Sequence, residues 1–331
     1  MNYEATRMRT MNAESVRTLA NEQYAVGTPT RVELLTTGHN DTYVVETAVD
    51  RYAFRVYGAS KSWIRGDDDL QFELDLLTHL HAHRAPISYP LNTRGGTTLG
   101  HVSTSAGERR YALFSWASGQ PLDSERWAPE AAHRLGHALA TVHVVADRFA
   151  TTGSRYRVDE QTLLDRSMER MRPRLEQADP AVVAFIEQQV TEIRGLLRSF
   201  DPGPHGWGII HADPQSLNIH VTADTVTLFD FDHCGFGWRA YDIAYALRHT
   251  GASGDPEAER RRAALVDGYR SVRPLTASEL KMLPTLGRAA WIREGTEAGH
   301  GLQPSKLATY LRDPYLPWFT GTEAADTWHP S

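Results

Sequence analysis

The sequence is poor in cysteine and in long apolar runs. Its 331 residues include one cysteine, Cys234, so an internal disulfide is excluded, as is typical of proteins from reducing compartments. No apolar run approaches the roughly 18 residues that a membrane-spanning helix needs. The first residues also lack the basic and apolar regions of a secretory signal. We therefore expect a cytoplasmic protein with no membrane partner.

The chain also lacks a strong excess of charge of one sign. It has 35 Lys and Arg against 41 Asp and Glu, a net charge of −6. This balance argues against nucleic acid as the main partner. The 15 histidines show no H-E-x-x-H or comparable zinc spacing. Lysine is rare as well, because only Lys61, Lys281 and Lys306 are present and the other basic residues are arginine.

What is present, from residue 31 to 117, is a series of β-forming runs. RVELLTT and TYVVETAV are separated by turn-forming residues, and YAFRVY alternates like a third strand. DDDLQFELDLLTHLHAH begins with acids and keeps apolar residues at helical spacing. Two further strand candidates follow, TTLGHVS and RYALFSWA. The stretch therefore predicts the order β-β-β-α-β-β.

The rest of the chain is predicted to be mainly helical. APEAAHRLGHALATVHVVA has one apolar helical face, and 158–200 and 256–311 are also of helical type. The predicted fold class is α+β, with a β-rich N-terminal lobe at 31–117 and a helical C-terminal lobe at 118–331. Residues 1–30 are predicted to be an extension with a short helix.

Four polar residues gather around a predicted hairpin at 208–232. Asp213 and Asn218 precede its first strand, and Asp230 and Asp232 follow its second, so the turn brings Asp230 back toward Asn218. Mg²⁺ takes oxygen ligands, and one or two carboxylates suffice where phosphates supply the others. A separate carboxylate can then orient a hydroxyl nucleophile, which makes this a set of groups for phosphoryl transfer. The alternative is that these are solvated acids of loops and strand ends.

Three motifs carry a family resemblance. His211–Asn218 reads H-x-D-x-x-x-x-N, 228–232 is LFDFD, and 241–244 is YDIA. In this order they resemble the aminoglycoside phosphotransferase and choline kinase family, small-molecule relatives of the protein kinases. The resemblance covers about 31–250 and implies a protein-kinase-like two-lobe fold.

The resemblance also implies roles for these residues. Asp213 would be the catalytic base, Asn218 and Asp230 the Mg²⁺ ligands, and Asp232 a ligand of a second metal. Asp242 is expected to brace the catalytic loop. His211 is interpreted as an anchor of the same loop, with a direct catalytic role as the alternative.

A kinase also needs a cation on its third strand and a helix glutamate that holds it. The strand YAFRVY offers Arg55, whose planar fork can grip phosphate. Glu73 lies in an apolar helical stripe, where a carboxylate is costly unless it is paired. We therefore predict an Arg55–Glu73 ion pair. The alternative for Arg55 is an exposed residue on an edge strand.

Two backbone segments complete the expected nucleotide site. The turn at Gly38 and Asn40 is expected to cover phosphates through its N–H groups, although an ordinary hairpin loop is the alternative. By family resemblance, Ser115, Trp116 and Ala117 form the hinge that meets the purine edge. Core packing is the alternative for Trp116.

The predicted function is transfer of the γ-phosphate of ATP, with Mg²⁺, to a hydroxyl of a small molecule, and GTP is not excluded. The acceptor would be an antibiotic such as an aminoglycoside, an amino alcohol, a homoserine-like amino acid or a sugar. The alternatives are a Ser/Thr protein or peptide kinase and a nucleotide-binding pseudokinase. The oligomeric state stays open.

The acceptor is expected beside Asp213, against a wall formed by 151–180 and 285–320. Glu294 and Glu297, three residues apart on one helix, could face a cationic acceptor. The alternative is a solvated helix face.

Overall fold

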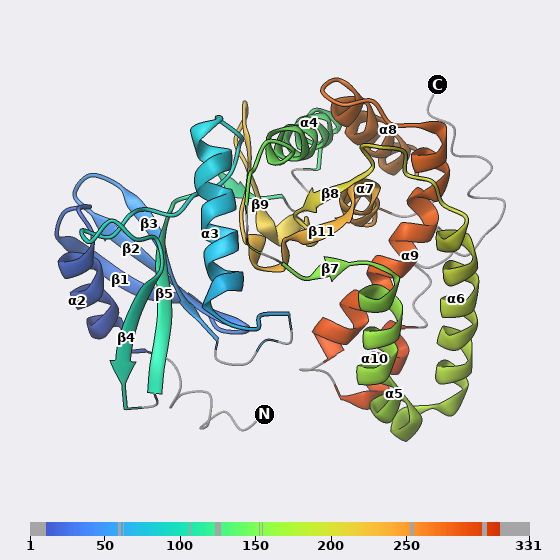
Figure 1. Cartoon of the computed structure of the whole chain (residues 1–331), viewed down its shortest axis with the longest axis horizontal. Coiled ribbons are helices and arrows are strands. Elements are labelled where there is room, and N and C mark those ends of the chain that lie inside the picture. The colour runs from blue at the N-terminus through green and yellow to red at the C-terminus, as the bar shows by residue number, and fades with distance from the viewer. Residues whose placement is uncertain are drawn as a thin grey trace. The chain divides into compact units, whose positions relative to one another are not determined.

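The computed structural model describes residues 11–58, 61, 63–105, 107–122, 127–151, 153, 155–251, 255–299 and 303–311. They form two compact units. The first unit contains the chain up to Ser118 and two returning segments, Phe149–Arg155 and Thr227–Asp232, and the second contains the remainder. The expected order, a β-rich part followed by a mainly helical part, is confirmed (Figure 1). The limits predicted from the sequence placed neither returning segment with the first unit.

A five-stranded sheet forms the frame of the first unit, in the order β1-β2-β3-β5-β4. All neighbouring strands pair antiparallel. The strands are β1 (Pro29–Thr36), β2 (Asn40–Thr47), β3 (Arg51–Tyr57), β4 (Gly100–Thr104) and β5 (Gly107–Ser115). They coincide with the five predicted runs, so the β-β-β-α-β-β order is confirmed.

Helices α2 (Ala13–Gln23) and α3 (Asp67–Ala82) cover opposite faces of this sheet (Figure 1). Successive side chains of a strand point to opposite faces. Phe54 of β3 packs in the buried apolar cluster that includes α2 residues, whereas the next residue, Arg55, pairs with Glu73 of α3. Consecutive residues of β3 thus contribute to an apolar core on one face and to a polar site on the other.

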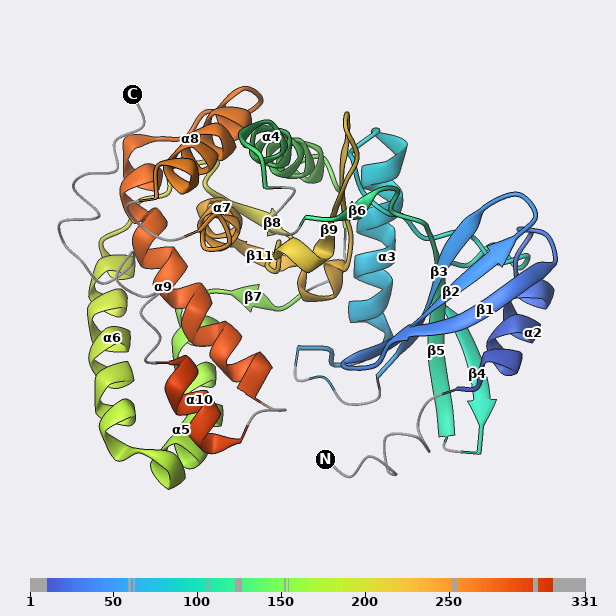
Figure 2. The ribbon, with the colours of Figure 1, turned by 180° about the vertical axis from the view of Figure 1, so that it is seen from behind.

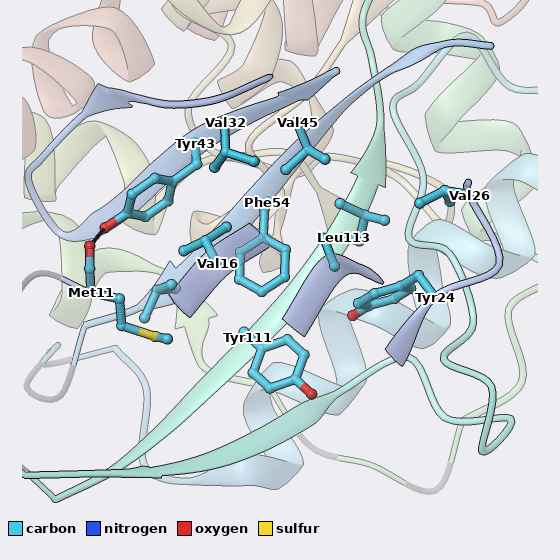
Figure 3. Close-up of a cluster of buried hydrophobic side chains, with 12 residues drawn as sticks. Met11, Val16, Tyr24, Val26, Val32, Tyr43, Val45, Phe54, Tyr111 and Leu113 are labelled. Carbon is cyan, nitrogen blue, oxygen red and sulfur yellow. Dashed lines mark hydrogen bonds between the residues drawn. The ribbon is translucent and has the colours of Figure 1, made fainter. Parts of the chain in front are cut away.

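Aromatic rings fill the apolar cluster (Figure 3). Phe54 and Tyr111 stack with ring centroids 5.2 Å apart, and Tyr24 meets each of them edge-on at 6.4 Å. Such ring pairs stabilise a core beyond the area they bury. The Tyr43 hydroxyl donates to the backbone carbonyl of Met11, which satisfies the polar end of that side chain.

The short helix expected within residues 1–30 is α2. Asn12 caps it by accepting a hydrogen bond from the Ser15 N–H at 2.7 Å. Val16 and Ala20 of this helix are fully buried in the apolar cluster. The helix is therefore a layer of the first unit.

Helices dominate the second unit (Figure 2). They are α4 (Pro129–Ala146), α5 (Arg166–Ala178), α6 (Pro180–Arg198), α7 (Arg239–Leu247), α8 (Pro256–Arg270), α9 (Ala277–Gly299) and α10 (Pro304–Tyr310), with a π-turn at Gln161–Asp165. The short strands are β6 (Gln120–Pro121), β7 (Arg157–Val158), β8 (Trp207–Ile210), β9 (Ile219–Val221) and β11 (Gly235–Trp238). The predicted hairpin is present, and its second strand, β10 (Val226–Leu228), leads into the first unit. Within the described ranges, the helices are too short or too polar to cross a bilayer.

Glycines let α4 and α8 pack with their backbones close together. A Cβ atom on Gly136 would lie 1.9 Å from the carbonyl oxygen of Leu265, and one on Gly268 would lie 1.9 Å from that of His133. Real Cβ atoms do not approach backbone atoms so closely, so the two helices would have to separate.

We predict that Gly268→Ala lowers the melting temperature although alanine is the better helix former. Overpacking typically costs about 1–3 kcal/mol, which exceeds the roughly 1 kcal/mol that alanine gains over glycine in a helix. The matched control is Gly195→Ala in α6, where an added Cβ meets nothing within 4 Å. Thermal unfolding should show a loss for Gly268→Ala and no loss for Gly195→Ala. Equal changes would contradict the close packing.

Candidate active site

The predicted catalytic loop lies between β8 and β9 and is held by Asp242 of α7. The carboxylate of Asp242 accepts the backbone N–H groups of His211 and Ala212, each at 2.8 Å. Ala212 has φ of +67°, a conformation that non-glycine residues rarely adopt. Asp242 is fully buried, so these charge-assisted hydrogen bonds are shielded from water. The prediction that Asp242 braces this loop is confirmed.

A buried histidine, His143, orients the carboxylate of Asp242. His143 of α4 contacts the Asp242 carboxylate through Nε2 at 2.9 Å and the Tyr269 hydroxyl through Nδ1 at 2.8 Å. Burial lowers the pKa of His143, although Asp242 opposes that shift. The ring is therefore neutral, and its Nε2–H donates to Asp242 while Nδ1 accepts from Tyr269. The sequence analysis missed this histidine, because its neighbours are more than 90 residues away along the chain.

Arg293 of α9 holds the same loop from the other side. Its guanidinium donates to the carbonyl of Ala212 at 2.7 Å and to the Tyr156 hydroxyl at 3.1 Å. It also contacts Nδ1 of His233 at 2.8 Å. The Ala212 residue is thus bound at its N–H by Asp242 and at its C=O by Arg293. The sequence had placed Arg293 in the acceptor wall, whereas the structure makes it a support of the catalytic loop.

The Asp213 carboxylate is oriented by two side-chain amides. It accepts hydrogen bonds from Asn218 at 2.9 Å and from Gln215 at 3.1 Å. Asn218, at the end of a short 3₁₀ turn (Ser216–Asn218), also donates to the backbone carbonyl of Asp213 at 3.0 Å. His211 is buried, and its Nδ1 accepts the Asp213 N–H at 3.3 Å, as expected of a loop anchor.

In the first unit, Arg55 connects two carboxylates. Its guanidinium lies 3.0 Å from Glu73 and 3.2 Å from Asp230, so the predicted Arg55–Glu73 ion pair is present. Arg55 and Glu73 are buried, whereas the Asp230 side chain is 40% exposed. Asp230 has φ of +61°, which lies, like that of Ala212, in the left-handed region that non-glycine residues rarely adopt.

The charge states of this group follow from burial and pairing. Burial raises the pKa of the Glu73 carboxyl, and the positive charge of Arg55 opposes the shift. For Arg55, burial acts to lower the pKa, but Asp230 and then Glu73 raise it above its usual value. Arg55 is therefore a fixed cation that is paired with both carboxylates.

The Asp232 carboxylate pairs with Lys61, one of the three lysines of the chain. Nζ of Lys61 lies 2.8 and 2.9 Å from the two carboxylate oxygens of Asp232, and Asn40 donates to the same carboxylate at 3.3 Å. Arg155 donates to the Asp232 backbone carbonyl at 2.5 Å. A second-metal role for Asp232 stays a prediction, and it would require Lys61 to move. Because Lys61 is the one lysine close to β3 in the sequence, its position could have indicated a partner for a nearby acid.

The predicted phosphate turn is fixed through Asn40. Its Oδ1 accepts the N–H of Gly58 at 3.4 Å. A Cβ atom on Gly38 would meet nothing within 4 Å, whereas one on Gly58 would lie 2.1 Å from the carbonyl oxygen of His39. The glycine that the turn requires is therefore Gly58, whose backbone lies against the His39 carbonyl. The prediction from the sequence had named Gly38 instead.

In the predicted hinge, Ser115 is tied to the loop before it. Its N–H donates to the carbonyl of Tyr89 at 2.9 Å, and its carbonyl accepts the Ser88 hydroxyl at 2.6 Å. Trp116 is half-buried, with the guanidinium of Arg51 5.1 Å from its ring centroid, and Ala117 is buried.

The expected metal ligands, Asn218 and Asp230, provide an amide oxygen and carboxylate oxygens, which are the donors that Mg²⁺ takes. In the described parts of the chain, no three or more His, Cys, Asp or Glu residues gather into a metal-binding group.

Residues 32–275 match the model of the phosphotransferase enzyme family. The chain belongs to this family. It is a small-molecule phosphotransferase of this family that acts on hydroxyl groups. The homoserine kinase of Brucella anthropi is 30% identical over 277 residues, which cover 82% of this chain and 79% of that protein.

Solved structures show the same fold. An amicoumacin kinase in complex with AMP-PNP, Ca²⁺ and its ligand has a TM-score of 0.76 at 17% identity, covering 99% of this chain and 97% of that one. A microcompartment-associated aminopropanol kinase has a TM-score of 0.72 at 23% identity, covering 91% and 94%. The predicted protein-kinase-like fold of small-molecule kinases is confirmed for this phosphotransferase.

Glu73→Gln should raise the KM for ATP by about tenfold, because an amide keeps the shape of the carboxylate and removes the charge that orients Arg55. The matched control is Asp75→Asn on the same helix. Asp75 is exposed and accepts a hydrogen bond from Gln71 at 2.7 Å. Steady-state kinetics should show less than about a twofold change for the control. Similar values for both variants would remove the buried pair from the nucleotide site.

His143→Gln should make the protein less sensitive to acid. The pKa of His143 is lowered in the folded state, so stability is complete above the unfolded value near 6.5 and is lost as the pH falls below it. One such group costs at most about 1.4 kcal/mol per pH unit. Unfolding measured at pH 6.5 and 5.5 should show a smaller loss for His143→Gln than for the wild type. His137→Gln, at an exposed position of the same helix, should behave like the wild type.

Proposed function

We propose that this phosphotransferase moves the γ-phosphoryl group of ATP, bound with Mg²⁺, to a hydroxyl of a small acceptor that also carries an amino group. The observation that carries the proposal is the carboxylate of Asp213, which two side-chain amides orient on a loop clamped by Asp242 and Arg293. A carboxylate fixed in this way can orient a hydroxyl and accept its proton.

The nucleotide and metal follow from the donor groups and from a neighbour. The presence of AMP-PNP and Ca²⁺ in the amicoumacin kinase structure supports a nucleotide and a divalent cation. Bound Mg·ATP would supply the phosphoryl group, and the cation would neutralise charge on its oxygens. Asn218 would offer its amide oxygen to the metal, and Asp230 its exposed carboxylate. Arg55, oriented by Glu73 and Asp230, would hold phosphate oxygens through its planar fork.

Backbone groups would position the rest of the nucleotide. The turn at Gly38 and Asn40 would cover phosphates through its N–H groups. Backbone groups of Ser115, Trp116 and Ala117 would meet the purine edge, as the family resemblance implies. GTP stays open as the alternative donor.

The amino group of the acceptor is supported by two relatives. One is named a homoserine kinase and the other an aminopropanol kinase. The part of the acceptor wall predicted at 300–302 and 312–320 lies outside the described residues, as does the side chain of Glu297. We propose the cytoplasm as the location, since a reducing compartment suits the single buried cysteine, Cys234.

The test is ADP release with Mg·ATP or Mg·GTP against aminoglycosides, amino alcohols, hydroxy amino acids, sugars and a protein mixture. Asp213→Asn should lower kcat by about 10²–10⁴-fold on the active acceptor, with ATP affinity within about threefold. Asp224→Asn, an exposed acid in the turn of the same hairpin, is the control. Loss of ATP affinity together with kcat would assign Asp213 a structural role. Phosphate found only in protein bands would favour the protein kinase alternative.

A further inference from the structure

A buried charged cluster in the second unit has no part in the chemistry proposed above. Arg248, directly after α7, forms a direct ion pair with Glu294 of α9. Their side chains are 10% and 23% exposed, respectively. The Arg248 guanidinium lies 5.4 Å from the ring centroid of Tyr245. Tyr310 of α10 lies beside this pair: burial raises the pKa of its phenol, and the negative charge of Glu294 raises it further.

Residues close to Glu294 and Arg248 in the chain connect this pair to the loop that carries Asp213. Glu294 follows Arg293, which donates to the Ala212 carbonyl at 2.7 Å, one residue before Asp213. On α7, the ring of Tyr245 lies 6.0 Å from that of Tyr241, whose hydroxyl accepts from Arg293 at 3.3 Å.

Two carboxylates act on the phenol of Tyr245. Burial raises the pKa of its phenol, and the negative charges of Asp213 and Glu294 raise it further. Tyr245 therefore lies in the field of both carboxylates. Through Tyr241 and Arg293, the cluster is connected by direct contacts to the residue before Asp213.

The Arg248–Glu294 ion pair leaves buried polar atoms of the cluster without a hydrogen-bond partner. Nη1 of Arg248 is buried and has no hydrogen-bond partner, and the same is true of Nε2 of the adjacent His249. In the described part of the chain, the other buried arginine atoms without a partner are all Nε atoms. A buried donor that stays unpaired is costly, so an Nη group left in this state indicates a place for a ligand acceptor.

We infer that Arg248 and Glu294 recognise the acceptor, and that the acceptor is a small hydroxy amino acid that carries a carboxylate as well as an amino group. This inference rests on the proposed function. The acceptor carboxylate binds Nη1 of Arg248, and its ammonium group binds Glu294. Its short aliphatic chain lies against Tyr245, and its hydroxyl reaches Asp213. Each charge of the ligand thus meets an opposite charge that is already desolvated.

The test uses three acceptors that share one hydroxyl-bearing chain. Homoserine has both charged groups, 3-aminopropanol lacks the carboxylate, and 4-hydroxybutanoate lacks the ammonium group. The measured quantity is kcat/KM from ADP release with Mg·ATP. Wild type should prefer homoserine over each of the other two by about 10- to 100-fold, the usual effect of one charge-assisted contact.

Two variants assign the charges to residues. Arg248→Gln should remove most of the preference for homoserine over 3-aminopropanol, and Glu294→Gln most of the preference for homoserine over 4-hydroxybutanoate. The control is Arg288→Gln, at a buried α9 residue that bonds to Gln189 and Glu192, and it should keep both preferences. If Arg248→Gln fails to fold, Arg248→Lys keeps the charge without the second Nη group and should weaken calorimetric binding of homoserine by about tenfold.

The outcomes separate this inference from the function on which it rests. Equal use of homoserine and 3-aminopropanol by the wild type would overturn the carboxylate contact, while the kinase proposal would stand. Phosphorylation of other acceptors with none of these three used would have the same meaning. A preference for homoserine that survives in Arg248→Gln would overturn the assignment to Arg248. No ADP release with any acceptor, together with no homoserine binding, would overturn both proposals.

Discussion

The catalytic half of this protein depends on how one residue, Ala212, is held. Its left-handed conformation is unfavourable for an alanine by roughly 1–2 kcal/mol, so contacts elsewhere must impose it. Asp242 binds its N–H and Arg293 binds its carbonyl. His143 and Tyr269 then fix the orientation of Asp242. Side chains from α4, α7, α8 and α9 thus fix a single residue, directly or through Asp242, and the position of Asp213 follows from their packing.

In the first unit, a single side chain, Arg55, likewise holds several groups in place. One planar guanidinium meets Glu73 from the helix and Asp230 from the returning segment at the same time. A lysine is a point charge on a flexible stem and would not bridge two carboxylates with this geometry. Lys61 instead neutralises Asp232, which lies two residues further along the chain. The two cations keep three buried or half-buried acids within a small volume without strong mutual repulsion.

Much of the fold and part of the site were predictable from the sequence. The strands alternated at the period of two, the helices showed apolar faces, and turn residues lay between them. The Arg55–Glu73 pair was predictable because a charged residue in an apolar helical stripe needs a partner. Asp213, Asn218 and Asp230 lie close together along the chain, so the motif identified them. These signals depend on residues that lie close together along the chain, so a single sequence is enough to detect them.

The sequence by itself therefore determined the order of the elements, the class of chemistry and the pair on β3 and α3. Only the tertiary structure decided that His143 supports Asp242, that Arg293 holds the Ala212 carbonyl and that Lys61 occupies Asp232. It also decided that Arg248 keeps an unsatisfied donor in a buried cluster. These contacts join residues that are far apart along the chain, often through backbone atoms. No spacing or periodicity records such a contact, since any residue can offer a carbonyl and its direction is set by how the helices pack.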